Sequence, residues 1–251
     1  MKRNIKLVIS YDGSRYNGWQ RQGNTSKTIQ EKIEQVLSKM TGEEIEIHGS
    51  GRTDAGVHAK GQVANFITDS KLPIEQIKNY LNQYLPNDIA VLEVMEVKER
   101  FHARLNAVKK RYNYTIWNDN VPNVFERNYM YTVEEPLDLE KMKQAADYLI
   151  GEHDFKSFCA NKRMKKSTIR TIYAINIYSA GSKIVLSFEG NGFLYNMVRI
   201  MAGTLIEVGL GEITPEQIVR ILERREREAA GALAPAKGLC LEKVWYEGER
   251  L

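Results

Sequence analysis

Apolar residues divide the first hundred residues into six predicted elements. Period-two alternation predicts strands, and apolar positions spaced three and four residues apart predict amphipathic helices. The clearest helix is 28–41, where one face carries Ile29, Ile33, Val36, Leu37 and Met40 before Gly42 ends it. The predicted strands are 4–11, 43–49, 61–68 and 89–97, and the predicted helices are 28–41 and 73–85. The order β-α-β-β-α-β is that of a ferredoxin-like fold.

The second half of the chain repeats this order approximately. No residue pattern recurs at a fixed period, so the repeat is one of topology. The predicted strands are 107–117, 169–178, 183–189 and 239–246, and the predicted helices are 138–150, 193–208 and 214–226. We therefore predict an α+β fold with two ferredoxin-like β-α-β-β-α-β halves, 1–103 and 104–251. Their sheets are expected to join into one long, mostly antiparallel sheet, with helices on one face and a central cleft on the other.

Composition places the chain among ordinary globular proteins. Apolar residues make up 43% and charged residues 27% of its 251 residues. No apolar run has the length of a membrane span, and the N-terminal apolar stretch is too short for a signal peptide. We therefore expect a cytoplasmic protein with no membrane partner. Cys159 and Cys240 are far apart, which suits a reducing compartment and excludes a cysteine-built zinc site.

Metal and charge patterns narrow the candidate chemistry. A metal site built from His48, His58 and Asp54 lacks a helical ligand frame, so we expect no metal. The net charge of +4 is weak evidence for nucleic acid by itself. Basic residues are concentrated at 109–111 (KKR) and 161–170 (NKRMKKSTIR). Each cluster is either a solvated face or a phosphate-binding surface.

The densest chemical signal is the segment HGSGRTDAGVHAKGQ at 48–62, which joins two predicted strands. Four glycines within 49–61 allow positive φ angles and close backbone approach. Asp54 lies at the middle, two residues after Arg52. The aspartate can form an ordinary Asx turn beside a solvated arginine, or it can be a catalytic acid on a rigid loop.

A lone arginine gives a second signal. Arg199 is the only charged residue from Gly190 to Ile206, within a predicted helix that is apolar around most of its circumference. A buried guanidinium needs a carboxylate or a phosphate partner. Asp54 is a candidate partner, and an ion pair that only joins helix to sheet is the alternative.

The strand KKRYNYTIW at 109–117 gives a third signal. Tyr112, Tyr114 and Ile116 share one face of this strand. Aromatic residues beside a basic cluster suit base stacking with phosphate contact. Core packing is the alternative for at least one of the two tyrosines.

At these segments the chain resembles the tRNA pseudouridine synthase A family over nearly its full length. The motif GRTDAGVH is highly specific, and seven segments occur in the same order. They are YDGSRYNGWQRQ, GSGRTDAGVHAKGQV, FHAR, KKRYNYTIW, GEHDFKSF, GNGFLYNMVRIMAGTLIEVG and APAKGLCLEKVWY.

The resemblance implies the pseudouridine synthase fold, an RNA-binding cleft and the isomerisation of uridine to pseudouridine at positions 38, 39 and 40 of the tRNA anticodon stem-loop. Asp54 matches the nucleophile, Tyr112 the active-site tyrosine and Arg199 the arginine paired with the aspartate. Arg52 matches a residue that helps hold the flipped-out nucleotide, and Leu241 falls where an aliphatic side chain lines the uracil pocket. A homodimer across which the tRNA reaches is also implied. The basic residues expected to bind tRNA are Lys109, Lys110, Arg111, Lys162, Arg163, Lys165 and Lys166.

The chemistry explains why no cofactor is expected. The N1–C1′ bond breaks, the uracil turns and C5 rejoins C1′, so nothing is added or lost and a carboxylate suffices as nucleophile. The sequence leaves open whether Asp54 attacks C6 or C1′. Two rival functions remain: an RNA-binding module without activity, and an enzyme that uses Asp54 on another bond. A glycosidase usually needs a second carboxylate and a phosphotransferase a metal, and neither stands out near Asp54 in the sequence.

Overall fold

The computed structural model describes residues 2–161 and 163–248. The chain divides into two compact units, Met1–Val108 with Leu241–Leu251 (unit 1) and Lys109–Cys240 (unit 2). The prediction of an α+β fold with a large, mostly antiparallel sheet is confirmed. No helix among the described residues is long and apolar enough to cross a membrane.

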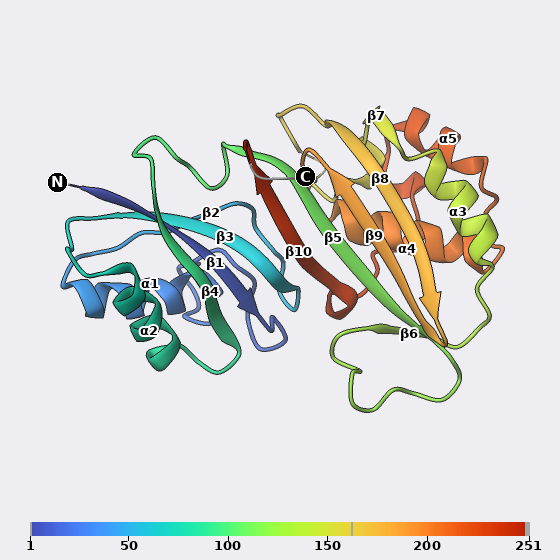
Figure 1. Cartoon of the computed structure of the whole chain (residues 1–251). Coiled ribbons are helices and arrows are strands. Elements are labelled where there is room, and N and C mark those ends of the chain that lie inside the picture. The colour runs from blue at the N-terminus through green and yellow to red at the C-terminus, as the bar shows by residue number, and fades with distance from the viewer. Residues whose placement is uncertain (1, 162, 249–251) are drawn as a thin grey trace. The chain divides into compact units, whose positions relative to one another are not determined.

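Unit 1 contains the first predicted β-α-β-β-α-β pattern (Figure 1). Its strands have the order β4-β1-β3-β10, and the short β2 pairs with β3. The β1–β3, β1–β4 and β2–β3 pairs are antiparallel. The bounds are β1 Arg3–Tyr11, α1 Ile29–Thr41, β2 His48–Gly49, β3 His58–Thr68, α2 Ile74–Tyr84, β4 Ile89–Val97 and β10 Leu239–Tyr246.

The core of unit 1 follows the predicted periodicities. Helix α1 begins after Thr28, whose side chain accepts a hydrogen bond from the Glu31 N–H, and it ends at Gly42, where φ is 74°. The C-terminal strand belongs to the same core, because the Tyr246 hydroxyl donates to the Ala103 carbonyl over 2.7 Å. Fully buried side chains of the unit include Ile5, Leu7, Ile9, Ile29, Ile33, Leu37, Phe66, Ile77 and Leu81.

The predicted strand 43–49 is largely wrong, since only His48–Gly49 pairs with β3. Ile45 and Ile47 are buried as their alternation suggests. Helix α1 supplies their hydrogen-bond partners in place of a neighbouring strand. The Ile45 N–H donates to Ser38 Oγ over 3.0 Å, and the Ile47 N–H donates to Glu34 Oε1 over 3.0 Å.

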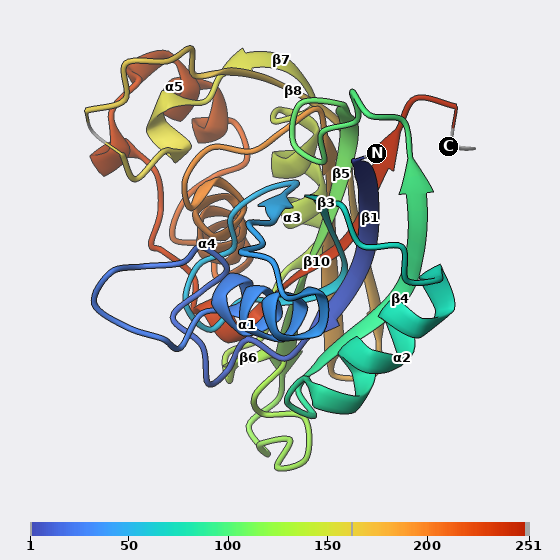
Figure 2. The same ribbon diagram turned by 90° about the vertical axis from the view of Figure 1, so that its left-hand side faces the viewer.

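Unit 2 has the strand order β5-β9-β8-β7, and the short β6 lies parallel to β5. Figure 2 shows α3 and α4 on the same side of β5 and β8. The bounds are β5 Ala107–Asn118, β6 Tyr131–Val133, α3 Leu139–Asp147, β7 Gly151–Asp154, β8 Ile169–Ala180, β9 Lys183–Gly190, α4 Met197–Gly209 and α5 Gln217–Arg224. Single 3₁₀ turns lie at Lys156–Phe158, Arg227–Ala229 and Ala236–Gly238.

Helix α4 begins at Met197, four residues later than predicted. Asn196 has φ 62°, in the left-handed region, so the helix cannot extend back through it. The strands β6 and β7 are short and were not predicted. The division of the chain into two halves of similar topology, 1–103 and 104–251, stays a proposal.

Candidate active site

The loop at residues 50–57, which we call the Asp54 loop, joins β2 to β3 and is fastened to β3 on one side. The Ser50 N–H donates to the Val63 carbonyl over 2.7 Å. Gln62 is fully buried; its Oε1 accepts from Ser50 Oγ over 2.7 Å, and its Nε2 donates to the Gly51 carbonyl over 2.9 Å. The start of the loop is therefore fixed before Asp54 is reached.

The segment 12–19, which follows β1, holds the other side of the loop. The Trp19 N–H donates to the Thr53 carbonyl over 3.0 Å, and Thr53 Oγ1 lies 2.7 Å from the Tyr11 hydroxyl in a buried hydrogen bond. On the far side of Asp54, the Gly56 N–H donates to the Tyr16 carbonyl over 3.3 Å. The backbone is thus bonded to segment 12–19 both before and after Asp54.

Two glycines allow this close packing of segment 12–19 on the Asp54 loop. A Cβ atom at Gly13 would overlap the Val57 carbonyl group. Gly18 has φ +89°, and a Cβ there would lie 2.6 Å from the Thr53 carbonyl oxygen. Both positions therefore require glycine. At Gly13 a side chain has no room, and at Gly18 it has no room and the positive φ angle also disfavours it.

Asp54 itself is half-buried at the middle of this fixed loop. Its carbonyl oxygen accepts from the Val57 N–H over 3.1 Å, which closes a tight turn immediately after it. A half-buried carboxylate on a rigid backbone suits a nucleophile, since little reorganisation is needed before attack.

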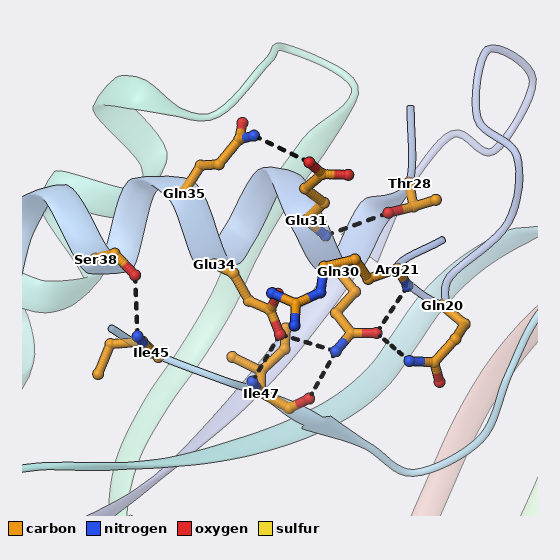
Figure 3. A network of polar contacts seen from close by, with 10 residues as sticks. All are labelled: Gln20, Arg21, Thr28, Gln30, Glu31, Glu34, Gln35, Ser38, Ile45 and Ile47. Atoms are coloured by element: carbon orange, nitrogen blue, oxygen red, sulfur yellow. Dashed lines mark hydrogen bonds and ion pairs between the residues drawn. The ribbon is translucent and has the colours of Figure 1, made fainter. Parts of the chain in front are cut away.

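Arg52 is exposed beside Asp54 and is held by one side chain. Its Nε donates to Gln20 Oε1 over 3.0 Å. Gln20 precedes α1 and belongs to a polar network that includes Gln30 of this helix, as Figure 3 shows. The side chain that the resemblance assigns to the flipped nucleotide is therefore connected to the interior of unit 1.

In unit 2, Tyr112 lies on β5 and is 7% exposed. Its ring meets Phe193 edge to face, with ring centroids 5.3 Å apart. Tyr114, two residues on, is fully buried and donates its hydroxyl to the Pro235 carbonyl over 2.9 Å. Burial raises the pKa of Tyr114 above its ordinary value, so this hydroxyl stays protonated. Tyr114 thus packs in the core.

Arg199 lies near the start of α4, most of which is buried, as its apolar composition predicts. Its Nε donates to the Ala234 carbonyl over 2.8 Å, and its Nη1 donates to Asn196 Oδ1 over 3.3 Å. Two neutral acceptors therefore orient the guanidinium from within unit 2. These two contacts fix the position of the guanidinium.

Two cations of the 109–111 cluster contact the same carboxylate. Glu189 on β9 accepts from Lys109 Nζ over 2.9 Å and from Arg111 Nε over 2.7 Å, and Arg111 is its cross-strand neighbour. Burial raises the pKa of Glu189, but hydrogen bonds from Lys109 and Arg111 outweigh it and hold the pKa below its ordinary value. The pairing lowers the net positive charge at Lys109 and Arg111.

The second basic cluster differs, because its cations are exposed. Arg163, Lys165 and Lys166 are exposed in the connection between the Lys156–Phe158 turn and β8, and within the described part of the chain no carboxylate pairs with them. Lys162, the fourth predicted cation, lies outside the described residues. Arg170 closes the connection, as its Nη1 donates to the carbonyls of Ser167 and Ile169 over 3.0 and 2.6 Å.

The predicted site residues thus fall in both units. Asp54 and Arg52 lie in unit 1 with Leu241, which is fully buried on β10, and Tyr112 and Arg199 lie in unit 2. His48, considered above as a metal ligand, stacks on His102 with ring centroids 5.2 Å apart. Over residues 2–161 and 163–248 no group of three or more His, Cys, Asp or Glu side chains is placed to hold a metal ion.

Sequence reasoning missed Gln62, Phe193 and the polar residues of α1. Gln62 bonds to Ser50 and Gly51 of its own segment, but no pattern in the sequence distinguishes it from an exposed glutamine. Phe193 gives no pattern because its partner Tyr112 is far away in the sequence. The signal for Gln30 and Glu34 was present: they occupy the α1 face of Ile33 and Leu37, where a polar side chain must find buried partners.

Comparison with known proteins identifies the family of the chain. The model of the tRNA pseudouridine synthase family matches residues 7–106 and 145–247, which is most of the chain. The chain belongs to the tRNA pseudouridine synthase family.

Its curated relatives carry a more particular name. The chain is 52% identical over 243 residues to "tRNA pseudouridine synthase A 2" of Bacillus cereus, covering 97% of this chain and 99% of that protein. It is 53% identical over 243 residues to "tRNA pseudouridine synthase A" of a Bacillus species, with the same coverage. It is also 50% identical over 246 residues to the Clostridium perfringens protein "tRNA pseudouridine synthase A 2", covering 97% of this chain and all of that protein.

Proposed function

We propose that this protein isomerises uridine to pseudouridine in tRNA, at positions 38, 39 and 40 of the anticodon stem-loop, with Asp54 as nucleophile. The observation that carries the proposal is the Asp54 loop. Its backbone is bonded to segment 12–19 before and after Asp54, and glycines at 13 and 18 make that contact sterically feasible. Membership of the family supplies the reaction, and the relatives' names supply the substrate class.

The reaction needs only groups of this chain and the RNA. The ionised carboxylate of Asp54 adds to the target nucleoside, at C6 of the base or at C1′ of the ribose, and the N1–C1′ bond breaks. The uracil turns and its C5 bonds to C1′. A carboxylate on C1′ leaves as this bond forms, whereas a carboxylate on C6 is released afterwards. The proton on C5 departs and N1 gains a proton, so the product is an isomer of the substrate.

Four further residues take distinct roles in this proposal. Arg199 stabilises the ionised form of Asp54, since a nearby guanidinium lowers a carboxyl pKa that burial would raise. Tyr112 offers a ring on which the flipped uracil can stack, and that stacking partly offsets the few kcal/mol required to leave the helix. Arg52 holds the flipped nucleotide from the Asp54 loop, and Leu241 provides an aliphatic wall for the uracil.

The tRNA body is proposed to lie on the exposed cations. Arg163, Lys165 and Lys166 suit phosphate contact because they are exposed and positive. Lys162 is included on the strength of the sequence. Lys109, Lys110 and Arg111 are proposed as the contact nearer to Tyr112.

The proposal also includes a homodimer, which the family resemblance implies, and a cytoplasmic location, which the sequence suggests. Light scattering on the purified chain tests the dimer. A mass of one chain across the micromolar range would remove it without affecting the proposed reaction.

Pseudouridine mapping tests the reaction itself. Unmodified tRNA transcripts with uridine at 38, 39 or 40 in turn are incubated with the protein alone, without nucleotide or added metal. We expect pseudouridine at these positions and nowhere else. Binding without modification would identify an inactive RNA-binding module, and cleavage of the glycosidic bond with loss of uracil would identify a hydrolase.

A further inference from the structure

Three side chains link the exposed Arg52 to the interior of unit 1 by successive hydrogen bonds. Arg52 Nε donates to Gln20 Oε1 over 3.0 Å, and Gln20 Nε2 donates to Gln30 Oε1 over 2.7 Å. Gln30 Nε2 in turn donates to Glu34 Oε1 over 2.8 Å. Figure 3 shows the part of this relay from Gln20 to Ile47. We call Gln20, Gln30 and Glu34 the α1 relay.

Backbone groups fix the direction in which the relay points. The Arg21 N–H donates to Gln30 Oε1 over 2.9 Å, and the Ile47 carbonyl accepts from Gln30 Nε2 over 3.2 Å. A backbone N–H can only donate and a carbonyl can only accept, so the Gln30 amide has one possible orientation. Its oxygen therefore faces Gln20, which must turn its NH₂ group inward and its oxygen toward Arg52.

The inner end of the relay is buried and anchored by charge. Gln30 is 3% and Glu34 is 4% exposed. Glu34 Oε1 also accepts from the Ile47 N–H, and its Oε2 pairs with Arg21 Nη1 over 3.0 Å. Buried polar groups are tolerated only when they are fully bonded, so the relay has little freedom to rearrange.

The outer end leaves part of Arg52 available to a ligand. The bond to Gln20 uses Nε alone, and among the described residues Nη1 and Nη2 of Arg52 have no hydrogen-bond partner. A guanidinium held at Nε presents its two terminal amino groups as a fork, which matches two oxygens of a phosphodiester. Holding the side chain beforehand also lowers the entropy lost when the ligand binds.

We propose that Gln20 and Gln30 are positioning residues, which orient Arg52 toward the phosphodiester beside the target uridine. This inference rests on the proposed function, and it assigns to the α1 relay a role in holding the flipped nucleotide. Neither glutamine touches the RNA. Each acts on the reaction only through Arg52.

A double-mutant cycle tests the dependence on Arg52. The variants are Gln20→Ala, Arg52→Ala and the double variant, each measured for kcat/KM of pseudouridine formation and for Tm. Gln20→Ala should lower kcat/KM by about 2- to 12-fold, the usual range for one lost hydrogen bond, with Tm close to wild type. In the Arg52→Ala background the same change should have no further effect.

A matched pair on α1 tests the inner part of the relay. Gln30→Glu removes the donor to the Ile47 carbonyl and places a second carboxylate beside Glu34. Gln35→Glu makes the same chemical change at an exposed position of the same helix, where the side chain donates a hydrogen bond to Glu31 Oε1. Gln30→Glu should lower kcat/KM in wild type but not in Arg52→Ala, whereas Gln35→Glu should leave kcat/KM unchanged.

The outcomes distinguish failure of the positioning role of Gln20 and Gln30 from failure of the proposed function. Losses that multiply in the double variants, or wild-type kcat/KM for Gln20→Ala, overturn the positioning role while the enzyme stays active. A wild-type protein that makes no pseudouridine overturns the proposed function, and this inference with it.

Discussion

Replacing Gly18 with alanine tests whether segment 12–19 sets the position of Asp54. The new Cβ would lie 2.6 Å from the Thr53 carbonyl oxygen and 3.1 Å from the Asp54 carbonyl carbon, whereas ordinary contact begins at 3.4 Å. Either the segment or the Asp54 loop must therefore move by about 0.8 Å. Alanine at φ +89° adds strain of roughly 1–2 kcal/mol.

A displacement of this size is large for a reacting group. A shift of about 1 Å can lower the rate about 100-fold, because the nucleophile no longer reaches the attack geometry. We expect Gly18→Ala to reduce the single-turnover rate at saturating tRNA by about 10- to 100-fold, with tRNA affinity nearly retained. The assay is pseudouridine formation, with Tm measured in parallel.

Gly42→Ala is the matched control. Gly42 also has a positive φ, +74°, but no atom lies within 4 Å of its Cβ position. Gly42→Ala should therefore carry the φ strain without the overlap and keep the wild-type rate. Equal rates for Gly18→Ala and Gly42→Ala would refute the claim that segment 12–19 positions Asp54.

Four further variants test residues of unit 2. Tyr112→Phe should bind tRNA normally but lose rate if its hydroxyl assists removal of the C5 proton, and Tyr112→Ala should also weaken capture of the flipped base by roughly 1–3 kcal/mol; near-wild-type rates for both would leave Tyr112 a core residue. Arg199→Leu should raise the pKa of Asp54. Activity needs the ionised carboxylate, so as the pH is lowered the variant should lose activity at a higher pH than wild type does. If the acid limb of the pH–rate profile does not move while Tm is unchanged, the two residues are not partners. The fourth variant replaces four cations with Gln: Lys162, Arg163, Lys165 and Lys166. It should weaken binding of all tRNAs alike and reduce the slope of log K against log salt by about 0.7 to 0.9 per lost contact. An unchanged slope would show that the cluster is a solvated face.

Much of the fold could be predicted from local pattern. The residues of α1 carry both a helical apolar face and end signals, Thr28 and Gly42, that act within the helix itself. Strands β1 and β4 also follow their own alternation, which buries Ile5, Leu7 and Ile9 in β1 and Ile89 and Val91 in β4. The segment 43–49 could not be assigned correctly, because its hydrogen bonds go to side chains of α1, which no pattern within the segment reveals.

Residues of the candidate site could be predicted where a charged residue differs in chemistry from the residues around it in the sequence. Asp54 stands among glycines and Arg199 in an apolar helix, and each of these contrasts can be seen in the sequence. The partners that orient Arg52 and Arg199 were not predictable. Gln20 on Arg52 and Ala234 on Arg199 are 32 and 35 residues away from their partners, and the contacts form only after the units fold. The pairing of Lys109 and Arg111 with Glu189 likewise depends on the register of β5 and β9.

Asp54→Asn is the most direct measurement of the central claim. Asparagine keeps the shape of the side chain and removes only the ionised oxygen, so the Asp54 loop and the tRNA surface should stay intact. The measurement is pseudouridine formation on tRNA transcripts at saturating enzyme, with tRNA affinity and Tm determined for the same preparation. We predict no pseudouridine, with affinity and Tm close to wild type. Turnover within about tenfold of wild type would contradict the assignment of Asp54 as the nucleophile.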